Sequence, residues 1–435
     1  MNKILTVVTI LLVSLVAQNT DDLLIEGKKL LNDGFVSEAQ NKLLAVVEAD
    51  PAAAEAHFLL SKIYLRQYDL DKTRESLRKA IDNDQTNQEY RDEFDHLTAL
   101  ASSMASAMRA LNGGDPEGAI AKFEKVNEDY AEYSAAGMYY IGVAFMRSDN
   151  PNEAAKFFRE SMNFDPSFER PGIALKSLTD KAYNEGNKLL RRGDYEGAED
   201  YFNKVIDIDP TYYQANFQLG YLNTKLGDYD LALEHYSKTV EKNPGYSKGW
   251  FALGLTHQRN GDYENAIKAL DSAINADPTY TKALVQKGKI LMKQGDYNTA
   301  ENALNQAIQV DPSYSSAYAD LGQIHVSQER WDDAISSLST ATALDIRLYK
   351  GWFLLAQAQN AQSACEDAKE SARSALDVKS DYAPAHYELG IAETCLGNKT
   401  AALSAFEDAR KDRSWRKNAE YEIDKIKNPE KYRNP

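Results

Sequence analysis

Apolar residues recur along most of the chain at the spacing of one helix face. Phe217 and Tyr221 lie four residues apart, and Leu219 and Leu222 lie three apart. Residues so spaced share one side of a helix, so the pattern predicts amphipathic α-helices. Glycine and proline divide these helices at regular intervals. The sequence therefore predicts an all-α protein made of many short helices.

The helical pattern repeats every 34 residues. Gly-Asp-Tyr triplets begin at residues 193, 227, 261 and 295, and a proline follows each triplet at residues 210, 244, 278 and 312. A tyrosine stands two residues after each of these prolines. Two columns of small residues keep the same period: Gly186, Gly220, Gly254, Gly288 and Gly322, and Ala198, Ala232, Ala266, Ala300 and Ala334. One structural unit is therefore repeated.

Each residue that recurs with this period has a physical explanation. The glycine of the triplet ends a first helix, because a left-handed C-terminal cap costs glycine little. The aspartate is a good N-cap for a second helix, and the proline stops that helix because it has no N–H. The columns of Gly and Ala mark where the two antiparallel helices approach closely. Larger residues at Phe202, Tyr236, Leu270, Leu304 and Leu338 fill the space beside them.

This unit resembles the tetratricopeptide repeat. Its signature is matched by the 34-residue period together with Trp250, Gly254, Gly261, Tyr263, Ala266, Ala273 and Pro278. We count eleven copies: 20–53, 54–87, 100–133, 135–168, 179–212, 213–246, 247–280, 281–314, 315–348, 349–382 and 383–416. The resemblance implies an α-solenoid, a right-handed superhelix of about eleven antiparallel helix pairs. First helices are expected to line its concave face.

Two interruptions break the period, at residues 88–99 and 169–178. Neither is rich in glycine or serine, so we expect each to lengthen the first helix of the following copy. We expect an N-terminal array over residues 18–168 and a C-terminal array over 169–416. Residues 417–435 are expected to form a capping helix and tail, since an open solenoid needs a cap at its end.

The resemblance implies a scaffold that binds extended peptides or helices in its concave groove. Residues three before and one after the columnar glycine should point into that groove. They are Tyr183 and Asn187, Phe217 and Tyr221, Phe251 and Leu255, Val285 and Lys289, Phe353 and Gln357, and Tyr387 and Ile391. Large rigid rings are good anchors for a bound peptide. The alternative is that these rings pack between neighbouring first helices.

Charge refines the expected ligand. The chain has a formal net charge of −16, which disfavours nucleic acid as a partner. Basic residues nevertheless gather near the expected groove: Lys225, Lys248, Arg259, Lys282, Lys289 and Lys293. The sequence from Thr281 to Gly295 has four lysines and no acid. We therefore expect a protein or peptide partner with an acidic or carboxylate flank, unless these lysines are only a solvated face.

Catalytic and cofactor motifs are not found in the sequence. The six histidines are scattered without the spacing of metal ligands, and there is no phosphate-binding glycine loop. We therefore expect no catalytic residues, no metal and no cofactor. Members of the resembled family mostly carry no chemistry of their own, so we expect a binding protein and not an enzyme. An enzyme with an unrecognised site is the remaining alternative.

Cys365 and Cys395 lie 30 residues apart, in or beside the turns of copies ten and eleven. Corresponding turns of neighbouring copies could bring them together. We expect a disulfide, with two unpaired thiols as the alternative. Such a bond would brace copy ten, whose many alanines bury few apolar atoms.

The N-terminal sequence predicts export. Residues 4–16 form an uncharged apolar run that suits a signal peptide and is too short to span a bilayer. We expect a signal peptide over residues 1–17, with an uncleaved anchor or a buried helix as alternatives, and no membrane span later in the chain. The expected location is a bacterial periplasm or the extracellular space. Besides a peptide-binding scaffold, a structural subunit of a membrane-associated envelope assembly is possible.

Overall fold

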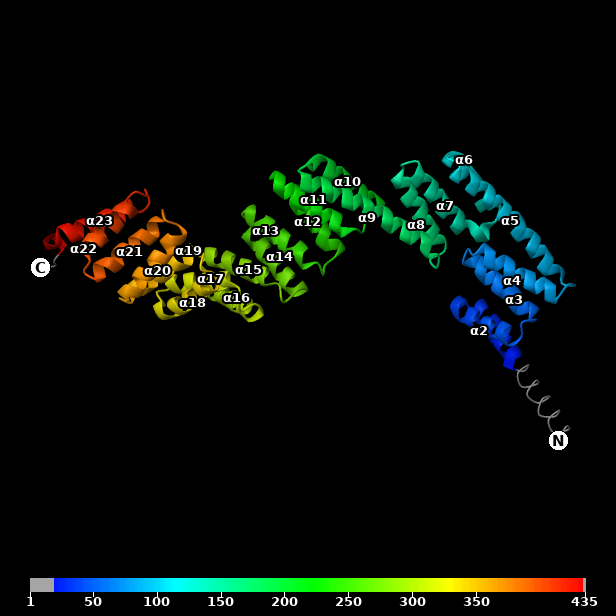
Figure 1. The fold of residues 1–435 in the computed structure, drawn as a ribbon, viewed down its shortest axis with the longest axis horizontal. Coiled ribbons are helices and arrows are strands. Elements are labelled where there is room, and N and C mark those ends of the chain that lie inside the picture. Colours follow the sequence, from blue (N-terminus) through cyan, green and yellow to red (C-terminus); the bar gives the residue numbers. More distant parts are fainter. Residues whose placement is uncertain (1–18, 433–435) are drawn as a thin grey trace, which may run out of the picture. The chain divides into compact units, whose positions relative to one another are not determined.

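A computed structural model describes residues 19–432, and within them all regular structure is helical (Figure 1). The first helices of successive pairs are the helical stretch 19–32, α3 (Ala54–Arg66), α5 (Gln88–Asn112), α7 (Ser134–Arg147), α9 (Glu169–Arg192), α11 (Tyr213–Leu226), α13 (Ser247–Arg259), α15 (Thr281–Gln294), α17 (Ser315–Ser327), α19 (Tyr349–Ala361) and α21 (Ala383–Cys395). The second helices are α2 (Val36–Ala49), α4 (Leu70–Asn83), α6 (Pro116–Asp129), α8 (Pro151–Phe164), α10 (Tyr195–Ile208), α12 (Tyr229–Lys242), α14 (Tyr263–Ala276), α16 (Tyr297–Val310), α18 (Trp331–Leu344), α20 (Cys365–Val378) and α22 (Lys399–Ala409). Each pair corresponds to one predicted copy.

The chain divides into two compact units, residues 1–215 (unit 1) and 216–435 (unit 2). The arrays drawn from the sequence met instead at residue 168. Both interruptions do lengthen a first helix, as predicted: α5 has 25 residues and α9 has 24. α9 is one unbroken helix that packs against both α8 and α10.

The turns between paired helices have the predicted geometry. Gly193, Gly227, Gly261 and Gly295 all have left-handed backbones, with φ between 80° and 85°. The aspartate after each glycine caps the second helix. In copy seven, for example, Asp262 Oδ1 accepts a hydrogen bond of 3.1 Å from the backbone N–H of Asn265.

The columnar glycines lie where paired helices touch. A Cβ built on Gly254 would lie 3.0 Å from Leu270 Cγ and 3.1 Å from the Ala266 carbonyl oxygen. Gly186 faces Phe202 in the same way in unit 1. The bulky partners Phe202 and Leu270 are fully buried. The close approach therefore forms a core between the two helices of each copy.

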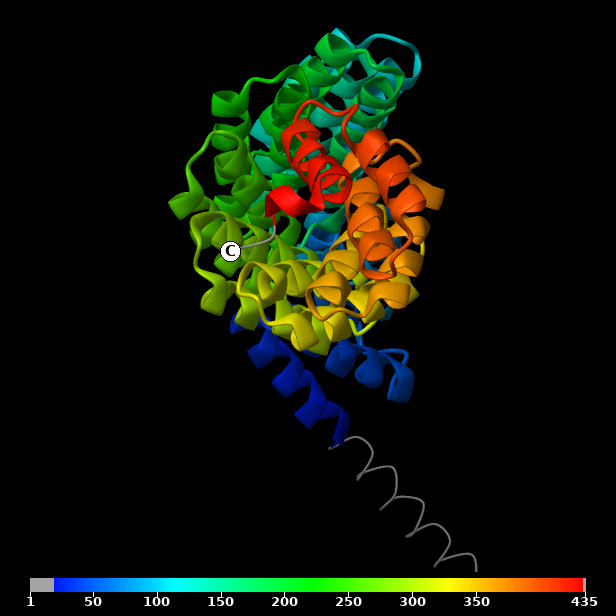
Figure 2. The ribbon, with the colours of Figure 1, turned by 90° about the vertical axis from the view of Figure 1, so that its left-hand side faces the viewer.

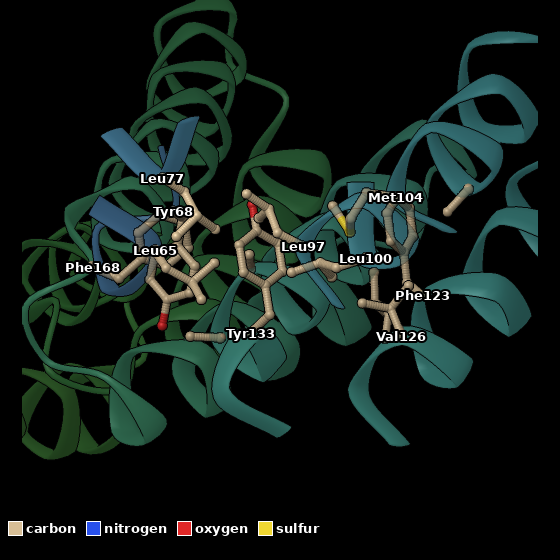
Figure 3. Close-up of a cluster of buried hydrophobic side chains, with 14 of the residues drawn as sticks. Leu65, Tyr68, Leu77, Leu97, Leu100, Met104, Phe123, Val126, Tyr133 and Phe168 are labelled. Carbon is tan, nitrogen blue, oxygen red and sulfur yellow. The ribbon is translucent and has the colours of Figure 1, made fainter. Parts of the chain in front are cut away.

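Unit 1 departs from the contacts of a regular solenoid, in which each repeat touches only its neighbours. Tyr68, in the turn of copy two, donates a 3.0 Å hydrogen bond to Asp165 Oδ2 at the end of copy four. Its ring lies 4.2 Å from that of Phe168 and 5.2 Å from that of Tyr133, the last residue of the short 3₁₀ helix η1 (Ala131–Tyr133) (Figure 3). Copies two, three and four therefore share one buried cluster.

The last helix, α23 (Arg416–Lys427), covers the C-terminal end of unit 2 beside α22 (Figure 2). Ala419 and Ile423 of α23 pack against Phe406 of α22, and Trp415 contacts Tyr387 at 5.0 Å between ring centroids. A short 3₁₀ helix, η2 (Pro429–Tyr432), follows. None of the helices in residues 19–432 has both the length and the apolar character needed to cross a membrane.

Candidate protein-binding face

Successive first helices of unit 2 lie directly against one another. Gln286 of α15 donates a 2.6 Å hydrogen bond to Gln258 of α13, and Asn360 of α19 donates one of 2.8 Å to Glu388 of α21. α15 and α17 are joined by an ion pair described below. We call the continuous surface made by α13, α15, α17, α19, α21 and residues 216–226 the first-helix face.

The aromatic residues predicted to bind peptide pack against other rings of the protein. The ring of Phe217 lies 5.6 Å from that of Tyr236 and 5.3 Å from that of Tyr246. Both tyrosines belong to the same copy as Phe217: Tyr236 is on its second helix, and Tyr246 lies in the turn that ends the copy, before α13. Phe217 is thus half-buried between its own second helix and the following turn.

The same contact recurs along the chain. Phe251 lies 5.1 Å from Tyr280, and Phe353 lies 5.7 Å from Tyr382. In unit 1, Tyr183 lies 5.2 Å from Tyr212. Each ring therefore packs against the tyrosine in the turn that ends its own copy and leads to the next one. Sequence alone could not separate the two roles, because both place an aromatic residue at this position.

Tyr221 is the exception among the predicted aromatic anchors that lie in unit 2. Its side chain is 40% exposed, and the Lys225 ammonium lies 5.4 Å from its ring centroid. A lysine over a tyrosine ring leaves the other surface of the ring available to a ligand. The two residues predicted to make polar contacts with the peptide, Asn187 in unit 1 and Gln357 in unit 2, are both half-buried.

The lysines of α15 are mostly engaged within the protein. Lys287 forms a 2.6 Å ion pair with Asp271, and Lys293 donates a hydrogen bond to the Tyr263 hydroxyl. Lys289, predicted to bind peptide, lies 3.5 Å from Asp320 of α17. Two of the four positive charges from Thr281 to Gly295 are therefore compensated by carboxylates on other helices.

Three of the exposed cations on α13 and α15 are not engaged in this way: Lys248, Arg259 and Lys282. None of them forms an ion pair within the described part of the chain. Lys248 lies in the first turn of α13 and Arg259 ends that helix, while Lys282 lies in the first turn of α15. Arg259 follows Gln258, and Lys282 lies one turn before Gln286, so both flank the contact between the two helices.

Two carboxyl groups on this face, those of Asp320 and Glu388, were not predicted from the sequence. Burial raises the pKa of Asp320 to about 6, although the neighbouring Lys289 lowers it. Burial also raises the pKa of Glu388 to about 7, against the lowering effect of the hydrogen bond from Asn360. Each acid stands two residues before a columnar glycine, Gly322 or Gly390. An acid two residues before the columnar glycine was the signal that could have identified them.

Cys365 and Cys395 are joined at disulfide distance, as the predicted bond requires, with their Cα atoms 6.0 Å apart. They connect the start of α20 to the end of α21. Glu393 of α21 is buried and lies 3.4 Å from Lys369 and 3.3 Å from Arg373, both on α20. A covalent bond and an ion-pair cluster thus hold the same two helices together. Residues 19–432 contain no group of three His, Cys, Asp or Glu residues that could hold a metal.

Family models agree with this architecture. Models described as tetratricopeptide repeat match residues 26–87, 183–247 and 291–345. All three segments consist of the helix pairs described above, with their 34-residue period. The chain is a tetratricopeptide repeat protein. A further model, of subunit 3 of the anaphase-promoting complex (cyclosome), matches residues 227–307.

Individual relatives of this tetratricopeptide repeat protein are distant. The DnaJ homolog subfamily C member 7 homolog of Dictyostelium discoideum is 30% identical over 84 residues, which are 19% of this chain and only 16% of that protein. Similar structures include the C-terminal part of a tetratricopeptide repeat-containing protein from Cytophaga hutchinsonii, with 20% identity, coverage of 55% of this chain and 97% of that one, and a TM-score of 0.46. YrrB, described as having an unusual peptide-binding site, shows 18% identity, coverage of 44% and 98%, and a TM-score of 0.40. The Cut9–Hcn1 hetero-tetramer of the anaphase-promoting complex shows 13% identity, coverage of 94% of this chain and 96% of that one, and a TM-score of 0.43.

Tetratricopeptide repeat arrays are protein–protein interaction scaffolds, and they generally have no catalytic activity of their own. This tetratricopeptide repeat protein is therefore a scaffold that binds protein partners.

Proposed function

We propose that this protein binds a peptide or protein segment along the first-helix face of unit 2. The observation that carries the proposal is the presence of Lys248, Arg259 and Lys282 on two adjacent first helices, exposed and without carboxylate partners in the described chain. In a chain of net charge −16, such a group is a specific complement to an acidic ligand. By family resemblance this face is the concave one.

The ligand we infer has an acidic stretch beside an apolar or aromatic residue. The acidic stretch would lie over α13 and α15, where Arg259 and Lys282 flank the contact between Gln258 and Gln286. The apolar residue would contact the exposed ring of Tyr221. Exposed cations act through a screened field, so the affinity should fall as salt is raised. The half-buried rings of Phe217 and Phe251 would form part of the surface under the ligand without being its main contacts.

We also propose that the scaffold works outside the cytoplasm, in a cell envelope. The apolar run over residues 4–16 lies outside the described residues, so support comes from its sequence and from the cysteine pair. Disulfides persist mainly in oxidising compartments. N-terminal sequencing of the protein from its native cells tests this: a chain that begins at Met1 would contradict cleavage of a signal peptide.

A charge-reversal experiment tests the binding face. The triple variant Lys248→Glu/Arg259→Glu/Lys282→Glu is compared with Lys242→Glu/Lys399→Glu/Lys417→Glu, which makes the same charge change at exposed lysines elsewhere in unit 2. The probe is a peptide library that combines aromatic residues with acidic stretches. Peptides selected by the native protein should lose binding to the first variant and keep it with the second. Equal binding to the native protein and both variants would refute the proposal.

A further inference from the structure

Copy ten differs from the other copies of unit 2 in the size of its core residues. Ala356 stands in the glycine column, and Ala372 stands where the other copies carry a large residue, such as Leu338 in copy nine or Phe406 in copy eleven. Around Ala372, Ser371, Ser374 and Ala375 are also small. At this position the second helix α20 therefore carries a smaller buried side chain than α18 and α22 do in their own copies.

A hollow of about 290 Å³ lies in this region. It is lined by residues of three helices: Ser339, Thr342 and Ala343 of α18, Trp352, Leu355 and Gln359 of α19, and Asp367, Glu370, Ser371 and Ser374 of α20. The hollow belongs mainly to second helices and lies apart from Lys248, Arg259 and Lys282. Its volume suits one long side chain and not a helix or a folded element.

The apolar part of the lining is held in place. Trp352 Nε1 donates a 3.0 Å hydrogen bond to the Ile346 carbonyl, which fixes the plane of the indole ring. Leu355 is buried beside it. The disulfide between Cys365 and Cys395 fixes the start of α20, the helix that forms the opposite wall. The hollow is therefore an open recess in the surface with an aromatic wall that is held in place.

The polar part of the lining offers hydrogen-bond acceptors. Asp367 and Glu370 lie three residues apart on α20, and neither forms an ion pair within residues 19–432. Gln359 Oε1 is buried and accepts no hydrogen bond from the described residues. No lysine or arginine is among the residues that line the hollow. Two carboxylates, an unpartnered amide oxygen and an indole ring together favour a cation that carries several N–H donors.

We propose that this hollow binds an arginine side chain of a protein partner. A guanidinium group is planar and carries five N–H donors, so it can stack on Trp352 while it donates to Asp367 and Glu370. A lysine ammonium would satisfy the same carboxylates but could not stack in this way. The site selects a charge opposite to that selected by the first-helix face, so it stands or falls independently of the proposed function.

The test uses the full chain and three capped tripeptides, acetyl-Gly-Arg-Gly-amide and its lysine and citrulline counterparts. Nitrogen-15 labelling of tryptophan gives an indole N–H signal for Trp352, assigned with Trp352→Phe. The arginine peptide should shift this signal saturably and more strongly than the lysine peptide. Citrulline, which is neutral and nearly isosteric, should cause no saturable shift. An equal response to arginine and citrulline, or no response to arginine, would overturn the proposal.

Two variants locate the binding. Asp367→Asn/Glu370→Gln should weaken arginine binding about tenfold or more, because charge-assisted hydrogen bonds are lost. The control Asp377→Asn/Glu420→Gln removes the same charge from exposed residues outside the hollow and should leave affinity unchanged. Ser374→Leu fills the hollow without changing charge and should abolish binding while thermal unfolding stays unchanged. If both charge variants weaken binding equally, the effect is general electrostatics and the site is refuted.

Discussion

Leu338 of α18 occupies the space directly over Gly322 of α17, and a methyl group on Gly322 would overlap its side chain. The same relationship joins Gly390 to Phe406. Copy ten has a different pair at these positions: Ala356 replaces the glycine, and Ala372 replaces the large residue on the second helix. A small residue on one helix thus permits a large one on its partner, and the two positions set the helix separation together.

This complementarity predicts coupled effects on stability. Gly322→Ala should lower the free energy of unfolding by about 1–3 kcal/mol, because the extra methyl overpacks the core. Leu338→Ala alone should cost about 2–5 kcal/mol through the cavity that it leaves. The double variant recreates the alanine pair of copy ten and should cost clearly less than the sum. Urea unfolding of the four proteins measures the coupling, and strict additivity would contradict a direct contact.

The turns predict a second set of stability changes. Glu329 has the left-handed backbone, with φ of 56°, that glycine provides at Gly261. Glu329→Gly should therefore stabilise the protein by roughly 0.5–1 kcal/mol, after allowing for the greater entropy of glycine in the unfolded chain. Gly261→Ala should destabilise it by about 1 kcal/mol. Both are measured by thermal unfolding, with Gln328→Gly as a control outside the left-handed region.

The sequence predicted what repeats locally. Helix ends, glycine caps and close contacts depend on residues within one copy, so the period reveals them. The pairing of Lys287 with Asp271, and of Lys289 with Asp320, depends on how neighbouring helices stack. Such pairs have no regular spacing in the sequence, which is why the lysines of α15 looked like an open basic surface.

The contact between Tyr68 and Asp165 could not be predicted from the sequence either. The two residues are 97 positions apart and belong to copies that are not neighbours. Their meeting follows from the path of copies two to four, which include the lengthened helix α5. A pattern read copy by copy has no means of predicting a contact that skips one copy.

This skipped contact predicts cooperative behaviour in unit 1. Tyr68→Phe removes the hydrogen bond to Asp165 while keeping the contact between the Tyr68 and Phe168 rings. It should cost about 1 kcal/mol or more, because Asp165 loses a donor. Hydrogen exchange should then speed up in both copies two and four, which a nearest-neighbour array would not couple. Faster exchange in copy two alone would contradict the shared cluster.

The disulfide predicts a local response to reductant. Closing a loop of about 30 residues should contribute roughly 3–4 kcal/mol in the chain-entropy model. Reduction, or the variant Cys365→Ser/Cys395→Ser, should therefore speed hydrogen exchange in α20 and α21 and lower the melting temperature. The variant should be insensitive to reductant, which is the control. Unchanged exchange in both helices would mean that the ion pairs of Glu393 suffice to hold them.

Glu388 predicts how stability changes with pH. Burial raises its pKa to about 7 from a usual value of 4.5, so the folded protein holds a proton that the unfolded chain releases. The stabilisation is present in full below pH 4.5 and is lost as the pH rises through 7, by about 3 kcal/mol in total. Asp320 adds a smaller loss of the same sign near pH 6.

The variant Glu388→Gln isolates this effect. Glutamine keeps an oxygen that can accept the hydrogen bond from Asn360 Nδ2, and it cannot ionise. The variant should therefore match the native protein near pH 5 and be more stable at pH 8, as measured by urea unfolding at each pH. Glu420→Gln, at an exposed position of α23, should leave the pH profile unchanged. A variant that remains as pH-sensitive as the native protein between pH 5 and 8 would show that Glu388 ionises freely in the folded state.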